Sequence, residues 1–327
     1  MRHRILLTLL VLTWAVSWPV IKIGVSALPP LWYGVWRYLI AAACLFALLT
    51  LRREVALPPR ADWPLVAVSG ALQMGAYSAL TGLALTVLSP GRASVLAFST
   101  PIWVVPLSAW WLHEHISWRA GFGVVLGVSG VFAIAAPSIH LQESSQILAY
   151  ALLMTAAAAW AIAIVFVRAH VFIASALSLA PWQMLVAAGL LLPLALLFEG
   201  GPTAFGPAGA ASLAYVGPVA TAFAYWAVVQ AGRHVRASSM SMALLATPSL
   251  GILISALTLG EKVEPSLGAG VILIGAGIWL AAKASSPAHS LRTARPIRPR
   301  SCETRRTRRP GRADRSCGTS GGACGRR

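Results

Sequence analysis

One arginine lies deep inside an apolar stretch of this chain. Arg37 follows Pro30 by seven residues, which places it about 10 Å along a helix that begins near that proline. A cation that faces lipid at this depth is costly, so we expect Arg37 to face the interior of a helix bundle. There it could act as the counter-ion for a substrate carboxylate. The alternatives are that its side chain extends outward to the interface or pairs with Glu261.

A second cation ends a row of large side chains. Trp14, Trp18 and Lys22 recur every four residues and therefore share one helix face, and Pro19 beside that face is expected to kink the helix. The row could form an aromatic wall that leads a substrate to a cation. The alternative, which we favour for Lys22, is ordinary helix packing with the ammonium at the outer interface.

Two Thr-Pro pairs are candidate hinges. Thr100-Pro101 and Thr247-Pro248 each lie within an apolar run. A proline there frees a backbone carbonyl, and the neighbouring threonine can satisfy local backbone groups. Such breaks could line a substrate path or act as hinges, and a simple packing kink is the alternative.

Two glutamates, Glu114 and Glu261, end apolar runs. A carboxylate at the C-terminal end of a helix is not favoured by the helix dipole, so each is expected to have a partner, in gating or in folding. The sequence His113-Glu114-His115 lacks the His-Glu-x-x-His spacing of a zinc site. We therefore predict no metal site, and we expect no cofactor.

These residues belong to a chain with the composition of a membrane protein. Of 327 residues, 57% are hydrophobic and 11% are charged, against roughly 25% charged in soluble domains. A membrane span needs about 20 apolar residues. Ten candidate spans lie near residues 5–25, 31–51, 63–83, 92–112, 119–136, 147–167, 176–198, 208–231, 237–259 and 266–283.

The positive charges between the spans predict the orientation. With the N-terminus in the cytoplasm, the inner connections hold ten Lys or Arg residues, and the outer ones hold only Arg92 and Lys262. Because positively charged loops stay on the cytoplasmic side, we predict a multi-pass protein of the plasma (inner) membrane with both termini in the cytoplasm.

The two halves of the chain repeat one pattern at an offset of 146 or 147 residues. Trp14 corresponds to Trp160, and Arg37 to Gln183, which could hydrogen-bond within the same cavity. A repeat of five spans, an odd number, enters the membrane in the opposite sense the second time. We predict an all-α integral membrane protein with ten transmembrane helices as two inverted-topology five-helix repeats, residues 1–136 and 147–283. The internal counterpart of the first span also argues against a cleavable signal peptide there.

Tyrosines and glycines follow the same repeat. Tyr77 and Tyr225 fall at matching places in the third and eighth spans. A tyrosine inside a span needs a partner for its hydroxyl, so the two could line a cavity or tie neighbouring helices together. Glycines on the fifth and tenth spans are interpreted as helix-packing positions. They are Gly121, Gly123, Gly127, Gly130, Gly268, Gly270, Gly275 and Gly277.

Four short motifs carry a resemblance to a known family. They are Trp14 through Ile21-Lys22-Ile23-Gly24, Trp36-Arg37-Tyr38-Leu39, Gly91-Arg92-Ala93-Ser94 followed by Thr100-Pro101, and Gly260-Glu261. This pattern resembles the drug/metabolite transporter superfamily, specifically the EamA-type ten-helix exporters, over about residues 5–283. The resemblance implies a ten-helix basket of two pseudosymmetric halves that moves amino acids, metabolites or drugs, usually outward. His113, where the family usually has Gly, departs from the pattern.

The predicted spans contain cations but no deep Asp or Glu. Exporters of cationic drugs commonly use an intramembrane carboxylate, so we favour neutral, zwitterionic or anionic substrates. We predict a secondary transporter that exports small organic solutes, amino acids or related metabolites, by alternating access. An intramembrane enzyme is disfavoured because its motifs are absent from the sequence. A non-transporting polytopic membrane receptor or assembly protein remains the alternative.

The C-terminal region, residues 284–327, has a different composition. Its twelve arginines stand against only Glu303 and Asp314. We predict a disordered Arg-rich cytoplasmic tail, which could contact anionic lipids. Because the basic excess lies mainly in this tail, we expect the lipid bilayer and a small-molecule substrate as partners and no nucleic acid. The sequence assigns no oligomeric state.

Overall fold

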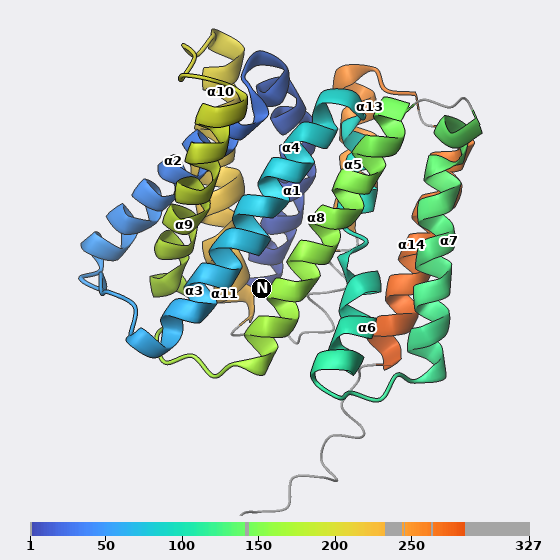
Figure 1. Ribbon diagram of the computed structural model, residues 1–327, viewed down its shortest axis with the longest axis horizontal. Coiled ribbons are helices and arrows are strands. Elements are labelled where there is room, and N and C mark those ends of the chain that lie inside the picture. Colours follow the sequence, from blue (N-terminus) through green and yellow to red (C-terminus); the bar gives the residue numbers. More distant parts are fainter. Residues whose placement is uncertain (1, 141–143, 233–243, 245, 263, 285–327) are drawn as a thin grey trace, which may run out of the picture. The chain divides into compact units, whose positions relative to one another are not determined.

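The computed structural model describes residues 2–140, 144–232, 244, 246–262 and 264–284. The predicted tail from residue 285 on, and most of residues 233–245, where the predicted ninth span begins, lie outside the described residues. Every regular element within the described ranges is a helix (Figure 1). The predicted all-α class is therefore confirmed for this part of the chain.

The helices follow one another through short connections. In chain order they are α1 (Arg2–Ala27), α2 (Pro30–Leu51), the 3-10 turn η1 (Arg60–Asp62), α3 (Trp63–Val68), η2 (Ser69–Ala76), α4 (Tyr77–Val87), α5 (Pro90–Ala97), α6 (Thr100–Trp111), α7 (Trp118–His140), α8 (Ser144–Ala169), α9 (Ala176–Phe198), α10 (Pro207–Tyr215), η3 (Val216–Phe223), α11 (Ala224–Gly232), α13 (Ala246–Leu259) and α14 (Pro265–Ala284).

Seven helical segments of the described chain are long and apolar enough to cross a membrane. They are Ile5–Ala27, Pro30–Leu51, Pro90–Trp111, Trp118–Pro137, Ser144–Ala169, Ala176–Phe198 and Pro207–Ala231. The other three predicted spans correspond to the helical stretch 63–87 and to the shorter apolar helices α13 and α14. Seven such segments make the chain a multi-pass membrane protein.

Prolines and left-handed residues set several helix boundaries. Pro30, Pro90 and Pro207 lie in the first turn of α2, α5 and α10, where a missing N–H costs no hydrogen bond. His113 after α6 has a φ of 53°, and Gly260 after α13 has a φ of 67°. These two positions correspond in the repeat. Glycine adopts this conformation freely, whereas the Cβ of histidine strains it.

The third and eighth spans both change from α- to π-helix at their centres. The π segments η2 (Ser69–Ala76) and η3 (Val216–Phe223) have eight residues each and are related by the repeat offset of 147. Residue periodicity predicts continuous α-helices here and gave no sign of the wider winding. Local π-helical turns are rare and occur often at functional sites.

The second helices of the two halves, α2 and α9, pack against each other and run in opposite directions. Trp32 near the start of α2 donates its indole N–H to the carbonyl of Gly200, just beyond the end of α9, at 2.9 Å. Phe46 near the end of α2 instead stacks edge-on against Trp182 near the start of α9, with ring centroids 5.2 Å apart. Residue numbers therefore increase along α2 as those of the contact partners decrease along α9, which is the pattern of antiparallel helices.

The last helices of the two halves, α7 and α14, lie side by side through glycines (Figure 1). A Cβ added to Gly277 would lie 2.4 Å from the carbonyl oxygen of Gly123, and one on Gly130 would lie 2.9 Å from that of Gly270. These pairs again require antiparallel helices. Backbones this close leave no space for larger residues.

Not all glycines of these helices have the predicted packing role. Among the described residues, a Cβ on Gly268 or Gly275 would meet nothing within 4 Å, and one on Gly121 would meet only Ile116 at 3.8 Å. For these three the packing interpretation is wrong, because they lie on helix faces turned away from the α7–α14 contact.

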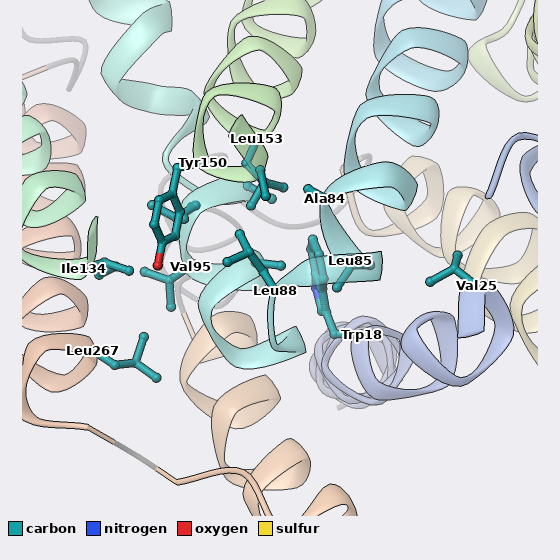
Figure 2. Packing of buried hydrophobic residues seen from close by; sticks show 14 of the residues in the cluster. Trp18, Val25, Ala84, Leu85, Leu88, Val95, Ile134, Tyr150, Leu153 and Leu267 are labelled. Carbon is teal, nitrogen blue, oxygen red and sulfur yellow. The ribbon is translucent and has the colours of Figure 1, made fainter. Parts of the chain in front are cut away.

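A hydrophobic cluster joins side chains from both halves (Figure 2). Trp18 of α1, Leu85 of α4, Leu153 of α8 and Leu267 of α14 are all buried in it. Large apolar side chains on α7 are exposed, for example Phe132. Apolar surface of this kind is typical of a helix that faces lipid.

Candidate functional site

Arg37 lies in α2, half-buried, and contacts the second half of the chain. Its Nε donates a hydrogen bond to the hydroxyl of Thr221 in η3 at 2.9 Å, and its Cζ lies 5.4 Å from the ring centroid of Tyr38. Among the described residues, no carboxylate lies within 4.0 Å of its guanidinium. The side chain is therefore a cation inside a span whose hydrogen-bond partner is neutral.

Aromatic side chains lie near this cation. Tyr38 is next to Arg37 in sequence and lies beside its guanidinium, and Tyr33, one turn earlier in α2, shares a hydrogen bond with the hydroxyl of Ser212 at 2.8 Å. Tyr77 at the start of α4 packs edge-on against Trp160 of α8, with ring centroids 4.6 Å apart. The structure thus brings together three residues of the predicted site, Arg37, Tyr77 and Trp160, from α2, α4 and α8.

Gln183 and Tyr225 form a separate pair within the second half. The Tyr225 hydroxyl donates to Oε1 of Gln183 at 3.2 Å, and Gln183 in α9 is only 3% exposed. The α2–α9 contact has two ends, one where Gly34 meets Leu191 and one where Phe46 meets Trp182. Arg37 lies toward the first end and Gln183 toward the second. The two repeat partners therefore lie at different depths.

The side chains of the predicted aromatic row on α1 have different surroundings. Trp18 is buried against Phe98, with ring centroids 6.4 Å apart, and Trp14 packs beside Leu10 and Ala224. The Lys22 ammonium donates to the carbonyls of Leu85, Thr86 and Leu88 at 2.5, 3.3 and 3.3 Å. Leu85 and Thr86 lie in the last turn of α4 and Leu88 directly follows it, so the ammonium binds the C-terminal end of this helix, where a cation is stabilising.

Pro19 lies within the continuous helix α1. Its missing N–H leaves the carbonyl of Ala15 without its usual helical donor. Gly251 of α13 approaches this carbonyl, since a Cβ on Gly251 would lie 3.7 Å from the Ala15 oxygen. The proline therefore lies where α1 meets α13.

The first Thr-Pro pair marks a break in the fourth predicted span. Residues 98–99 separate α5 from α6, and Thr100-Pro101 begins α6. The Ser99 hydroxyl donates to the carbonyl of Leu96 at 2.6 Å, and that of Thr100 donates to Ala97 at 2.9 Å. The Leu96 carbonyl also accepts the backbone N–H of Ser99 at 3.1 Å, so the Thr100 hydroxyl is the one that serves a carbonyl left free, that of Ala97, whose usual helical donor would be the missing N–H of Pro101.

The second pair, Thr247-Pro248, lies fully buried in α13. In the described part of the chain, the hydroxyl of Thr247 has no hydrogen-bond partner. This pair therefore lacks the carbonyl contact made by Thr100.

The two glutamates of the repeat lie in different environments. Oε2 of Glu261 accepts from the amide of Gly91 at the start of α5 at 3.3 Å. Burial raises the pKa of the Glu261 carboxyl, opposed by the Gly91 hydrogen bond and by the charges of Lys22 and Arg92. Glu114 is exposed, and its Oε1 lies 3.8 Å from Nη2 of Arg168.

A neighbouring ion pair strengthens the contact at Glu261. Nη2 of Arg92 in α5 donates to Glu264 at 2.5 Å, and Nη1 donates to the hydroxyl of Tyr150 at 3.2 Å. Residues 91 and 92 belong to the first half, and residues 150, 261 and 264 to the second. This cluster, which we call the α5 clasp (Gly91, Arg92, Tyr150, Glu261 and Glu264), joins the two halves.

Three residues that sequence reasoning missed also join the halves. Glu199 accepts from the amides of Leu31 and Trp32, both at 2.9 Å, and so caps the start of α2. Buried Asp62 accepts from the amides of residues 173 and 174, just before α9. Thr221 binds Arg37. Loop carboxylates beside span ends, and a hydroxyl at the centre of a span, were the available signals.

Comparison with known proteins gives the class of the molecule. The sequence profile of the EamA-like transporter family matches residues 3–136 and again residues 147–283. The chain therefore belongs to the EamA-like transporter family, and the predicted resemblance is confirmed. It is a multi-pass membrane transporter.

Individual relatives agree with this assignment. The chain is similar to the uncharacterized transporter YoaV of Bacillus subtilis, with 26% identity over 82% of this chain and 92% of the relative. It is also similar to a probable terminal-alkyne amino-acid exporter of Streptantibioticus cattleyicolor, with 28% identity over 84% of this chain and 91% of the relative. One protein of known crystal structure shares the fold, with a TM-score of 0.56 and 22% identity over 84% of this chain and 96% of the other.

Proposed function

We propose that this transporter exports amino acids or related small carboxylate metabolites, and that Arg37 binds the carboxylate of the substrate. The observation that carries the proposal is the half-buried guanidinium inside a span, bound to a neutral hydroxyl at Nε. A cation placed in a membrane protein interior needs a counter-charge. A substrate carboxylate supplies that charge while it is bound.

The aromatic neighbours fit a substrate with an apolar side chain. Tyr77 and Trp160 pack edge-to-face near the cation, and such rings favour apolar or aromatic groups. Gln183 and Tyr225 form a neutral polar pair toward the other end of the α2–α9 contact from Arg37. Trp14 and Trp18 lie in α1, the helix that also carries Lys22, and in this proposal they hold α1 in place beside the substrate site. A relative named as an amino-acid exporter is consistent with this substrate class.

The transport cycle in this proposal is alternating access of two inverted five-helix repeats that span the membrane ten times. The antiparallel pairs α2–α9 and α7–α14 support it, because each pair joins helices that correspond in the repeat. Inverted repeats of this kind place the substrate at their interface near the midplane. The loop charges favour the cytoplasm for both termini, and the inner membrane is the location in this proposal.

Hinges and gates complete the mechanism. Pro19 at the α1–α13 contact and the break at Thr100-Pro101 are the proposed hinges, with Thr247-Pro248 as the equivalent in the second half. The α5 clasp with Glu261 closes the outer side. Glu114 near Arg168 is the proposed partner on the inner side.

Transport in proteoliposomes tests the proposal. The purified protein is reconstituted, and the movement of a mixed pool of labelled amino acids and small carboxylate metabolites is measured for wild type, Arg37→Ala and Arg37→Lys. Arg119→Ala is the matched control, since Arg119 is exposed and lies over the ring of Trp118. We expect loss of transport in Arg37→Ala alone, with a folded protein that loses only about 1–3 kcal/mol of stability, as for one broken hydrogen bond to a buried hydroxyl. Undiminished transport by Arg37→Ala would make the arginine structural and refute the counter-ion role.

A further inference from the structure

Thr221 is a buried threonine, 8% exposed, in the middle of the π-helical segment η3. Its hydroxyl accepts the Nε–H of Arg37 at 2.9 Å. A guanidinium carries five N–H donors in one rigid plane. A bond at Nε fixes the orientation of that plane and leaves the outer edge, Nη1 and Nη2, to bind another group. This edge matches the two oxygens of a carboxylate.

The π-helix brings the two residues together by a close backbone approach. A Cβ on Gly217, four residues before Thr221, would lie 2.6 Å from Cγ2 of Ile40 and 3.6 Å from the carbonyl oxygen of Arg37. Only a glycine allows η3 to lie this near α2. The hydroxyl then lies at the height of the Arg37 side chain.

The other half of the molecule repeats this approach without the polar pair. A Cβ on Gly70 in η2 would lie 2.6 Å from the carbonyl oxygen of Gln183 and 2.7 Å from Cβ of Val186. These residues correspond in the repeat to Gly217, Arg37 and Ile40. The position that corresponds to Thr221 is Met74, which offers no hydroxyl.

The comparison of the halves separates packing from chemistry. The corresponding contact, between α9 and η2, forms with Gln183 in place of Arg37 and Met74 in place of Thr221. Helix packing at this place therefore needs neither an arginine nor a threonine. The Arg37–Thr221 pair at the contact of α2 with η3 therefore has a role beyond packing. Its hydrogen bond orients the guanidinium.

From this geometry we propose that Thr221 is a positioning residue, which turns Nη1 and Nη2 of Arg37 toward the substrate carboxylate. The inference rests on the proposed function, in which Arg37 is the counter-ion. It adds the residue that makes the site select a carboxylate over an uncharged group. Thr221 does not contact the substrate in this proposal and acts through Arg37.

The test measures transport by full-length protein in proteoliposomes, using the labelled amino acid or carboxylate metabolite of the mixed pool that wild type moves fastest. Its unlabelled carboxamide serves as competitor. Thr221→Val removes the hydroxyl at nearly constant volume, and Thr221→Ser keeps it. Thr155→Val is the matched control, because the hydroxyl of Thr155 on α8 is exposed and donates to the carbonyl of Ala151 in its own helix at 2.9 Å.

For Thr221→Val we expect a KM about tenfold higher, as for one lost hydrogen bond to a charged group, with little change in maximal rate. The preference for the carboxylate over the carboxamide should fall by a similar factor. Thr221→Ser should restore both quantities to within about twofold, and Thr155→Val should behave as wild type.

A double-mutant cycle separates positioning from structure. Lysine has no Nε–H fork, so Thr221→Val should raise KM less than about twofold in an Arg37→Lys background. Equal increases in both backgrounds, or a Thr221→Ser variant as impaired as Thr221→Val, would overturn the positioning role. If Arg37→Ala is impaired but Thr221→Val is not, this inference alone fails. If Arg37→Ala transports normally, or wild type moves no amino acid or carboxylate metabolite of the pool, the proposed function fails with it.

Discussion

Replacing Gly277 by alanine should force α14 away from α7. A Cβ at this position would lie 2.4 Å from the carbonyl oxygen of Gly123 and 2.9 Å from the amide nitrogen of Gly127. Both neighbours are helix backbone, which cannot turn aside as a side chain can. Ordinary contact begins at 3.4 Å, so the helices must separate by about 1 Å.

The matched control is Gly275→Ala in the same helix, where the added Cβ would meet nothing within 4 Å in the part of the chain that the structure describes. Both substitutions gain the same helix propensity, about 1 kcal/mol, so their difference isolates the packing term. Overpacking typically costs about 1–3 kcal/mol, and a 1 Å gap loses up to about half of the dispersion energy of each affected contact. We therefore expect Gly277→Ala to be about 1–3 kcal/mol less stable than Gly275→Ala.

Thermal unfolding of the purified variants in detergent measures this difference. Gly275→Ala should unfold at or above the wild-type temperature, and Gly277→Ala clearly below it. Equal unfolding temperatures for the two variants would refute the close approach of α7 and α14, and with it the antiparallel register of Gly123 and Gly277.

Three further predictions concern single residues at helix ends and in the α5 clasp. His113→Gly should relieve the strain of the positive φ and increase the free energy of unfolding by about 0.5–1 kcal/mol, which raises the unfolding temperature. A lower unfolding temperature would contradict the strain. Glu199→Gln should cost about 1–2 kcal/mol, since the cap of α2 loses its charge, whereas Glu54→Gln, at an exposed site, should be neutral in the same unfolding measurement. Because the pKa of Glu261 is raised in the folded protein, the folded state binds a proton there more tightly than the unfolded state does. Glu261 therefore stabilises the fold below pH 4.5, and this contribution is lost as the pH rises through the raised pKa. Glu261→Gln should therefore flatten the pH dependence of the unfolding temperature above pH 4.5, and an unchanged slope would contradict this assignment.

The sequence determined the class of the molecule, because lipid leaves a chain few choices. Backbone groups within a bilayer must be satisfied internally, so long apolar runs such as residues 5–27 and 176–198 can only be helices. The repeat that joins Trp14 to Trp160, and the motif around Arg37, predicted the transporter family that the comparison confirmed. The sequence also predicted a helix that begins near Pro30, which is where α2 starts.

The tertiary structure decided which of these residues meet. The π-helical winding of η2 and η3, the bond between Arg37 and Thr221, and the cap of α2 by Glu199 all join residues more than 100 positions apart or depend on such contacts. No local pattern encodes them, since each depends on how closely two helices approach. Glycines show the reason most directly: Gly275 and Gly277 are alike in sequence, but only Gly277 faces the backbone of α7, because two residues along a helix turn the side-chain direction by about 200°.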